Sequence, residues 1–123
     1  MSWELKSDRP IYAQLIEQLE LQICSGIYPP GARMPSVRDL AQEASVNPNT
    51  MQRALAKLEE DGLLYSHRTS GRFVTEDTNR IRETKSKLAQ EQIEKFLQKM
   101  TDLGFETSEM LVIIKKITEE LKK

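Results

Sequence analysis

Residues 34–54 of the chain read MPSVRDLAQEASVNPNTMQRA, and this stretch predicts two short helices joined by a tight turn. Ser36 begins the first helix in a capping-box-like pattern, with Asp39 at the position where glutamate is usual. Asn47 caps the second helix, and Pro48 stands at its first position, where a missing N–H costs no hydrogen bond. The few residues between the two helices leave room only for a turn. The stretch therefore predicts a helix-turn-helix.

Outward from that stretch, a helix precedes it and a hairpin follows it. Pro10 is expected at the first position of the preceding helix, whose apolar residues recur at helical spacing until Gly26 ends it. Residues 63–66 and 72–75 are strand-like and are separated by polar residues and a glycine. A helix-turn-helix followed by a hairpin is the plan of a winged helix-turn-helix, whose second helix enters the major groove of DNA.

The C-terminal third changes to two long helical patterns. One runs over roughly 79–103 and the other over roughly 108–122, with Thr107 or Ser108 as the cap of the second. Their apolar residues form wide stripes, which consist of Ile81, Leu88, Ile93, Phe96, Leu97, Met100 and Leu103 in the first helix and Met110, Leu111, Val112, Ile113, Ile114, Ile117 and Leu121 in the second. Neither helix can bury so wide a face against the other alone, so a partner chain is the simplest cover. A ligand cavity between the two helices is the alternative.

Length and composition exclude several classes of protein. A chain of 123 residues suits one compact domain, or a small domain with an appendage, and leaves little room for a separate catalytic domain. No apolar run approaches the ~18–20 residues that a bilayer span needs, so we expect a cytoplasmic protein without a membrane partner. Cys24 and His67 are the only cysteine and histidine. We therefore expect no disulfide, metal site, cofactor or catalytic residue, and no enzymatic activity.

The placement of charges says more than their sum. Lys and Arg number 18 and Asp and Glu 19, and the formal net charge of −1 argues against a protein that binds polyanions by bulk charge. Between Ala44 and Thr75, however, the acidic residues are confined to 59–61. The second helix of the helix-turn-helix begins with side chains that can pair with base edges, which are Asn47, Asn49, Thr50, Gln52 and Arg53. Any binding of nucleic acid would therefore depend on this local surface.

From Pro10 to Val74 the chain closely resembles the DNA-binding domain of the GntR family of bacterial transcriptional regulators. The matching stretches are PIYAQL at 10–15, GIYPPG at 26–31, MPSVRDLA at 34–41, VNPNTMQRA at 46–54, LEEDGLL at 58–64 and GRFV at 71–74. The short two-helix remainder, together with the run from Val46 to Thr50, resembles the YtrA subfamily. The resemblance implies that the two C-terminal helices serve dimerisation and that the regulated operon often encodes a transporter.

The same resemblance implies DNA-contacting roles for individual residues. Arg38 stands where the family has an operator-contacting arginine in the second helix. Asn47, Asn49 and Thr50 match contact positions of the recognition helix. Arg68 falls near the position at the tip of the wing that reaches into the minor groove.

Three departures from the family pattern affect this comparison. Pro48 and Gln52 occupy positions where better-known members have arginine. The residue that would usually contact guanine is therefore missing at these positions. Thr69 replaces the first glycine of the usual Gly-x-Gly wing, of which Gly71 is the second, so a wider turn is expected. Arg72 stands where a small polar residue is common, and we expect it to restore a phosphate contact.

Together these observations predict a mainly α (α+β) protein. Residues 9–77 are expected to form a winged helix-turn-helix domain and residues 78–123 an α-helical dimerisation region, against which Trp3 and Leu5 pack as an N-terminal arm. The predicted function is that of a homodimeric repressor of an inverted-repeat operator on double-stranded DNA, associated with the nucleoid when bound; whether it has a small-molecule effector is left open. The DNA-binding residues are expected to be Arg38, Asn47, Asn49, Thr50, Gln52, Arg53, Arg68, Thr69, Gly71 and Arg72. The alternative is a winged-helix adaptor that binds other proteins without specific DNA binding.

Overall fold

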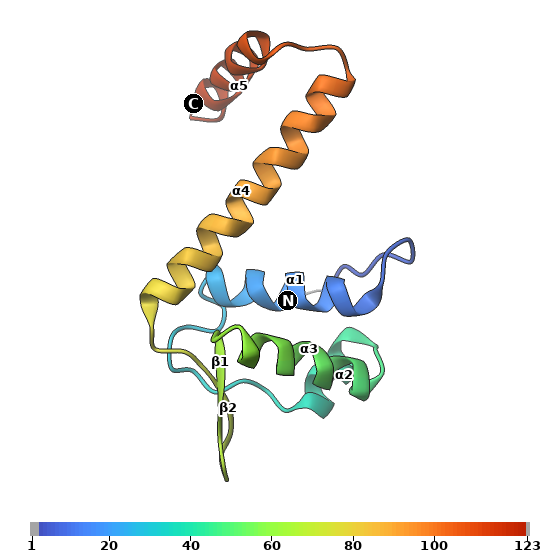
Figure 1. Cartoon of the computed structure of the whole chain (residues 1–123), viewed down its shortest axis with the longest axis vertical. Coiled ribbons are helices and arrows are strands. Elements are labelled where there is room, and N and C mark those ends of the chain that lie inside the picture. Colours follow the sequence, from blue (N-terminus) through green and yellow to red (C-terminus); the bar gives the residue numbers. More distant parts are fainter. Residues whose placement is uncertain (1–2, 123) are drawn as a thin grey trace. The chain divides into compact units, whose positions relative to one another are not determined.

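The computed structural model describes residues 3–122. Within these residues the chain forms five helices and one antiparallel two-stranded sheet (Figure 1). The elements are, in order, α1 (Ile11–Cys24), α2 (Val37–Ala44), α3 (Pro48–Glu60), β1 (Leu64–His67), β2 (Gly71–Val74), α4 (Thr78–Asp102) and α5 (Thr107–Leu121). The mainly helical fold with a winged helix-turn-helix is therefore confirmed.

The chain divides into two compact units, with the boundary between Lys85 and Ser86. In the first unit, α1 and α2 both pack on α3, and β1 contacts α3 as well (Figure 1). The core is one cluster of buried apolar side chains, made of Leu15, Leu19, Ile23, Met34, Leu40, Ala41, Ala44, Met51, Ala54, Leu55, Leu58, Leu63, Leu64 and Val74. Because α3 lies at the centre of this cluster, one face of α3 is fixed in the core and the opposite face is left at the surface.

The two caps of the helix-turn-helix form as predicted. The Ser36 hydroxyl accepts a hydrogen bond from the backbone N–H of Asp39 at 3.1 Å. The Asn47 side chain accepts one from the backbone N–H of Asn49 at 2.8 Å, and Pro48 stands at the first helical position. Ser45 closes α2 in the left-handed conformation, with φ of 58°. These local bonds fix the angle at which α3 leaves the turn.

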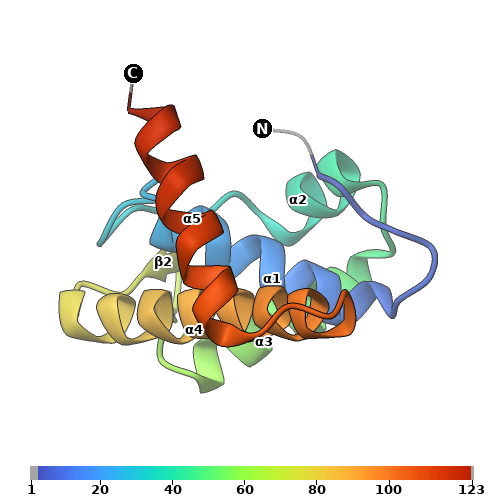
Figure 2. The same cartoon turned by 90° about the horizontal axis from the view of Figure 1, so that it is seen from above.

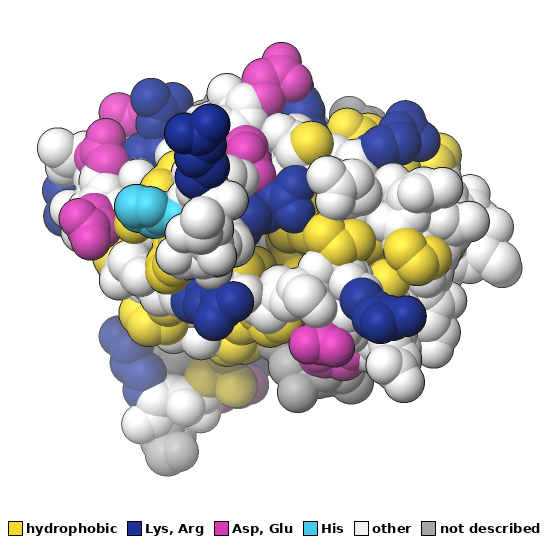
Figure 3. All heavy atoms as spheres, turned by 90° about the horizontal axis from the view of Figure 1, so that it is seen from below, with side chains coloured by type: hydrophobic (Ala, Val, Ile, Leu, Met, Phe, Trp, Pro, Cys, Tyr) yellow, Lys and Arg dark blue, Asp and Glu magenta, His cyan; other side chains and the backbone are white. Residues whose placement is uncertain are grey.

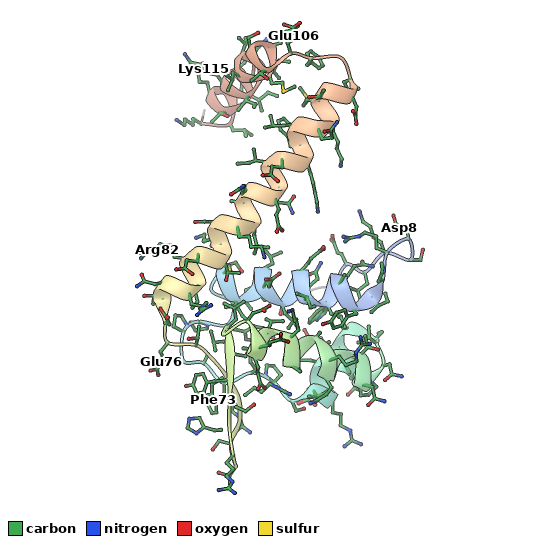
Figure 4. All side chains as sticks on the ribbon, in the orientation of Figure 1. Asp8, Phe73, Glu76, Arg82, Glu106 and Lys115 are labelled. Atoms are coloured by element: carbon green, nitrogen blue, oxygen red, sulfur yellow. The ribbon has the colours of Figure 1, made fainter. Side chains whose placement is uncertain are left out.

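The hairpin is present, with its strands displaced by one residue from the predicted 63–66 and 72–75. The register pairs Leu64 with Val74 and Ser66 with Arg72. The displacement arises because Leu63 remains part of the turn after α3, where its N–H bonds the carbonyl of Leu58 at 2.9 Å. The hairpin projects from the body of the first unit in Figure 4.

The prediction for the N-terminal arm was wrong. Trp3 and Leu5 pack against the core of the first unit, and Trp3 Nε1 donates a hydrogen bond to Glu43 Oε1 at 3.2 Å. The buried Gln14 side chain holds the arm there, since its Nε2 donates to the Lys6 carbonyl at 2.7 Å and its Oε1 accepts from the Lys6 N–H at 2.6 Å. The arm thus belongs to the helix-turn-helix unit.

Two helix starts also differ from their predictions. Pro10 is the N-cap of α1 rather than its first helical residue, because its ψ of 132° is extended. Glu106, labelled in Figure 4, caps α5 in place of Thr107 or Ser108. It forms a capping box with Glu109, whose carboxylate accepts a hydrogen bond from the Glu106 N–H at 3.1 Å.

The second unit consists of the C-terminal part of α4 and of α5. Gly104 ends α4 with φ of 99°, a conformation that favours glycine, and α5 then turns away from the line of α4 (Figures 1 and 2). Within the described residues of this unit, Met110 is the one buried apolar side chain. Many large apolar side chains are exposed there, namely Ile93, Phe96, Leu103, Leu111, Val112, Ile114, Ile117 and Leu121. No helix in the described part of the chain is long and apolar enough to cross a membrane.

Candidate nucleic-acid interface

The surface face of α3 carries the side chains that the sequence singled out. Met51, Leu55 and Leu58 are buried on the core face. At the remaining positions of the helical period, Asn49 and Gln52 are exposed. Asn47, Arg53 and the half-buried Thr50 complete this set. The polar N-terminal half of α3 is therefore presented to solvent, where it can reach base edges.

Arg53 lies over a neighbouring aromatic ring. Its guanidinium carbon is 4.7 Å from the centroid of the Tyr12 ring on α1, which is a cation–π geometry. The stack links α3 to α1 and holds the guanidinium over the Tyr12 ring. A contact from Arg53 to a base edge stays a prediction, and it would require the side chain to leave this stack.

Asn47 also has a structural role, because it caps α3. Its side-chain oxygen is occupied by the cap of α3, so its amide N–H₂ is the part that remains for a base or a phosphate. Bidentate pairing with adenine uses both the oxygen and the nitrogen of an asparagine. Asn49, whose side chain is exposed and has no hydrogen bond among the described residues, is the better placed of the two for that pairing.

Replacing Asn47 by alanine is expected to destabilise the fold by about 1 kcal/mol, because one N–H at the start of α3 loses its cap. Urea denaturation of the full chain measures this change. Asn49→Ala is the matched control, since only the backbone N–H of Asn49 takes part in the cap. Equal free energies of unfolding for the two variants would contradict the assignment of the cap.

Arg38 and Arg68 are exposed cations that have no partner among the described residues. Arg38 is exposed in the first turn of α2, and Arg68 is exposed in the turn between β1 and β2. Within residues 3–122 neither side chain forms an ion pair or a hydrogen bond. Figure 3 shows the molecule from below, where separate Lys and Arg side chains lie among uncharged side chains and several acidic ones, and the cyan histidine marks the hairpin. Both guanidinium groups are thus available to phosphate.

Arg72, by contrast, is already engaged. Its Nε donates a hydrogen bond to Glu59 Oε1, which also accepts one from the Ser66 hydroxyl at 2.6 Å. Burial by itself would raise the pKa of Glu59, but the hydrogen bonds from Ser66 and Arg72 outweigh it and the pKa lies below the usual range. Glu59 is therefore ionised at neutral pH. The contact of Arg72 with phosphate that the sequence predicts is not tested by the structure, and it would require the side chain to leave Glu59.

Sequence analysis missed Arg33, which lines an open groove of about 740 Å³ between the start of α2 and the wing. Ser36 borders the groove on the α2 side, and His67 and Gly71 border it on the wing side. Gly71 has φ of 99°, and a Cβ there would lie 3.5 Å from Arg33 Nε. The only signal in the sequence was its position, since Arg33 is the last basic residue before the helix-turn-helix. Its backbone pairing with Phe73 on β2 depends on the fold.

Thr69, between Arg68 and Gly71, is exposed in the turn of the wing. With Ser70 it completes a three-residue connection, in which the Ser70 N–H bonds the His67 carbonyl at 3.3 Å. Among the described residues, no group of three or more His, Cys, Asp and Glu side chains is placed to hold a metal ion. The exposed amides, hydroxyls and guanidinium groups of this surface offer hydrogen bonds and cationic contacts.

Comparison with known proteins gives a consistent result. The family model described as "Bacterial regulatory proteins, gntR family" matches residues 11–74. The uncharacterized HTH-type transcriptional regulator YhcF of Bacillus subtilis is 37% identical over 119 residues, which cover 97% of this chain and 98% of that protein. The HTH-type transcriptional repressor YtrA of the same organism is 32% identical over 118 residues, which cover 95% of this chain and 91% of that protein. These relatives are thus similar along almost their whole length.

Solved structures agree with the sequence relatives. A GntR family transcriptional regulator from Listeria monocytogenes has a TM-score of 0.84 and 36% identity, with 91% of this chain and 98% of that chain covered. The DNA-binding domain of AraR, in complex with operator ORE1, has a TM-score of 0.52 and 32% identity. That match covers 61% of this chain and 94% of the AraR chain. The similarity to AraR therefore extends over a domain that is bound to its operator.

Proposed function

The chain belongs to the GntR family of bacterial transcriptional regulators, and on that premise we propose that it is a homodimeric repressor of an inverted-repeat operator. One observation carries the proposal most directly. The exposed N-terminal half of α3 is polar and free of acidic side chains, and α2 and the wing carry exposed arginines, Arg38 and Arg68, that have no partner within residues 3–122. A surface of this kind can read bases with α3 while the arginines neutralise phosphates.

The proposed contacts divide into two kinds. Asn49, Thr50 and Gln52 face bases in the major groove, with Asn47 contributing its free amide N–H₂. Arg38 docks on phosphate and sets the angle of α3. The wing contributes Arg68 in the minor groove, and the adjacent residues Thr69 and Gly71 allow the backbone of the turn to approach the DNA closely. Arg53 joins the contacts if DNA draws it from Tyr12.

Dimerisation is assigned to residues 78–123, and DNA binding to residues 9–77. This division is supported by the exposed apolar side chains of α5, which include Ile117 and Leu121. A soluble monomer rarely leaves so many apolar side chains of one segment exposed to water. A second copy of the chain would cover them symmetrically. Two recognition helices related by a two-fold axis would then enter successive major grooves roughly 34 Å apart.

The regulatory role is proposed from the relatives. YtrA is named as a repressor, and its similarity covers nearly all of this chain. Repression follows physically if an operator-bound dimer occupies the site where polymerase must bind. The resemblance to the YtrA subfamily extends the proposal to control of a transporter operon, with the protein in the cytoplasm and on the nucleoid when bound.

Selection of bound sequences from a random DNA pool is expected to yield an inverted repeat with half-sites about one helical turn apart. Repeating the binding measurement at several salt concentrations gives the number of phosphate contacts from the slope of log K against log salt. If selection returns no common sequence and binding is weak on every fragment, the proposal fails and the adaptor alternative is favoured.

A further inference from the structure

Three polar side chains join the wing to the end of α3. Glu59, in the last turn of α3, accepts hydrogen bonds from Ser66 on β1 and from Arg72 on β2, both at its Oε1 atom. The Arg72 side chain is 19% exposed and the Glu59 side chain 29% exposed. Because the pair is partly shielded from water, it is screened less than an ordinary surface ion pair.

This cluster lies at the point of the hairpin where the strands leave the core. Ser66 and Arg72 are direct cross-strand partners, and they lie on the same face as the buried pair Leu64 and Val74. The cluster thus extends the inner face of the hairpin by one pair toward its turn. From His67 onward the hairpin is exposed up to the start of β2. Glu59 therefore provides the last side-chain link between α3 and the free end of the wing among the described residues.

We propose that the Glu59–Ser66–Arg72 cluster is a positioning device, through which α3 sets the direction of the wing on DNA. The inference rests on the proposed function, since it assigns work to the wing in operator binding. When base contacts fix α3 in the major groove, a wing held to α3 keeps Arg68 at a constant place relative to the neighbouring backbone. Arg72 then acts through Glu59, and Arg68 makes the contact.

This role reverses the usual effect of an acidic residue. Removing a carboxylate from a DNA-binding protein ordinarily strengthens binding, because repulsion with phosphate is relieved. Removing Glu59 would also release Arg72, which would strengthen binding further if Arg72 served as a phosphate contact. A positioning role predicts that removing Glu59 weakens binding to the operator, because the wing is then no longer held in one direction.

The test compares Glu59→Gln with Glu60→Gln in the full chain. Both variants remove one negative charge from the last turn of α3, but Glu60 is exposed and pairs only with Lys57 among the described residues, at 3.8 Å. Glu59→Gln is expected to bind the selected operator about tenfold more weakly than Glu60→Gln, with unchanged binding to random-sequence DNA. Circular dichroism and thermal unfolding monitor the fold of both variants.

Substitutions of Arg72 provide a second readout. Arg72→Gln is expected to lose as much operator affinity as Glu59→Gln and to have the same salt slope as Glu59→Gln, with no further loss in the double variant, whereas Arg72→Lys retains most of the affinity. A salt slope lower in Arg72→Gln than in Glu59→Gln by about one for each half-site would mark a direct phosphate contact of Arg72 and overturn the inference. So would equal operator affinities of Glu59→Gln and Glu60→Gln. Absence of sequence-selective binding by the wild-type chain would instead contradict the proposed function itself.

Discussion

A variant that ends at Lys85 is expected to bind the inverted-repeat operator on the order of 100- to 10,000-fold more weakly than the full chain, because two linked half-site interactions become one. The helix-turn-helix should stay folded, since the whole buried cluster from Leu15 to Val74 lies before the cut. The cut removes the exposed apolar side chains of α5, so the variant should also be a monomer. Sedimentation and fluorescence anisotropy measure the two effects.

A point substitution separates dimerisation from other effects of truncation. Ile117→Glu places a charge among the apolar side chains of α5, where Ile117 itself is 50% exposed in the single chain. Lys116→Glu introduces the same side chain one residue earlier, outside the stripe formed by Met110, Ile114, Ile117 and Leu121, and is the control. We expect a monomer from the first substitution and a dimer from the second. A tight dimer from the variant ending at Lys85 would show that the C-terminal helices are not the dimerisation region.

The helix-turn-helix could be predicted from sequence because its determinants are local. Ser36 and Asn47 each bond a backbone N–H two or three residues away, and Pro48 is tolerated only in the first turn of a helix. The positions of these residues in the sequence are therefore sufficient to predict the helix-turn-helix. The same reasoning gave the hairpin, with an error of one residue where Leu63 is held by the turn after α3.

Contacts between distant residues could not be predicted in this way. Glu59 was recognised only as one of three clustered acids, and Arg72 only as a basic residue of the wing, whereas the structure joins them across 13 positions. That pairing depends on the register of the hairpin and on the turn of α3 that faces it, which no local pattern specifies. Trp3 and Leu5 were misplaced for a similar reason, since Gln14 fixes the arm by bonds to its backbone.

The second large effect is expected from Arg38→Ala, at about 1–3 kcal/mol of binding free energy for each half-site. The substitution should remove no contact that stabilises the fold, because Arg38 is exposed, lies in the first turn of α2 and has no partner within residues 3–122. Alanine is also a favourable helix residue, so the free energy of unfolding should not fall. In a dimer the loss occurs at both half-sites.

The control for Arg38→Ala must remove the same charge elsewhere. Arg82→Ala does so in the first unit, on the exposed side of α4 and away from α2 and the wing in sequence. If Arg38 docks on phosphate, Arg38→Ala weakens binding to all sequences and lowers the salt slope by about one for each half-site. If it also sets the angle of α3, the selected operator loses more affinity than random DNA does. A footprint and affinity equal to those of Arg82→Ala would exclude Arg38 from the interface, and the docking of α2 would then have to rest on Arg33 at the adjacent groove.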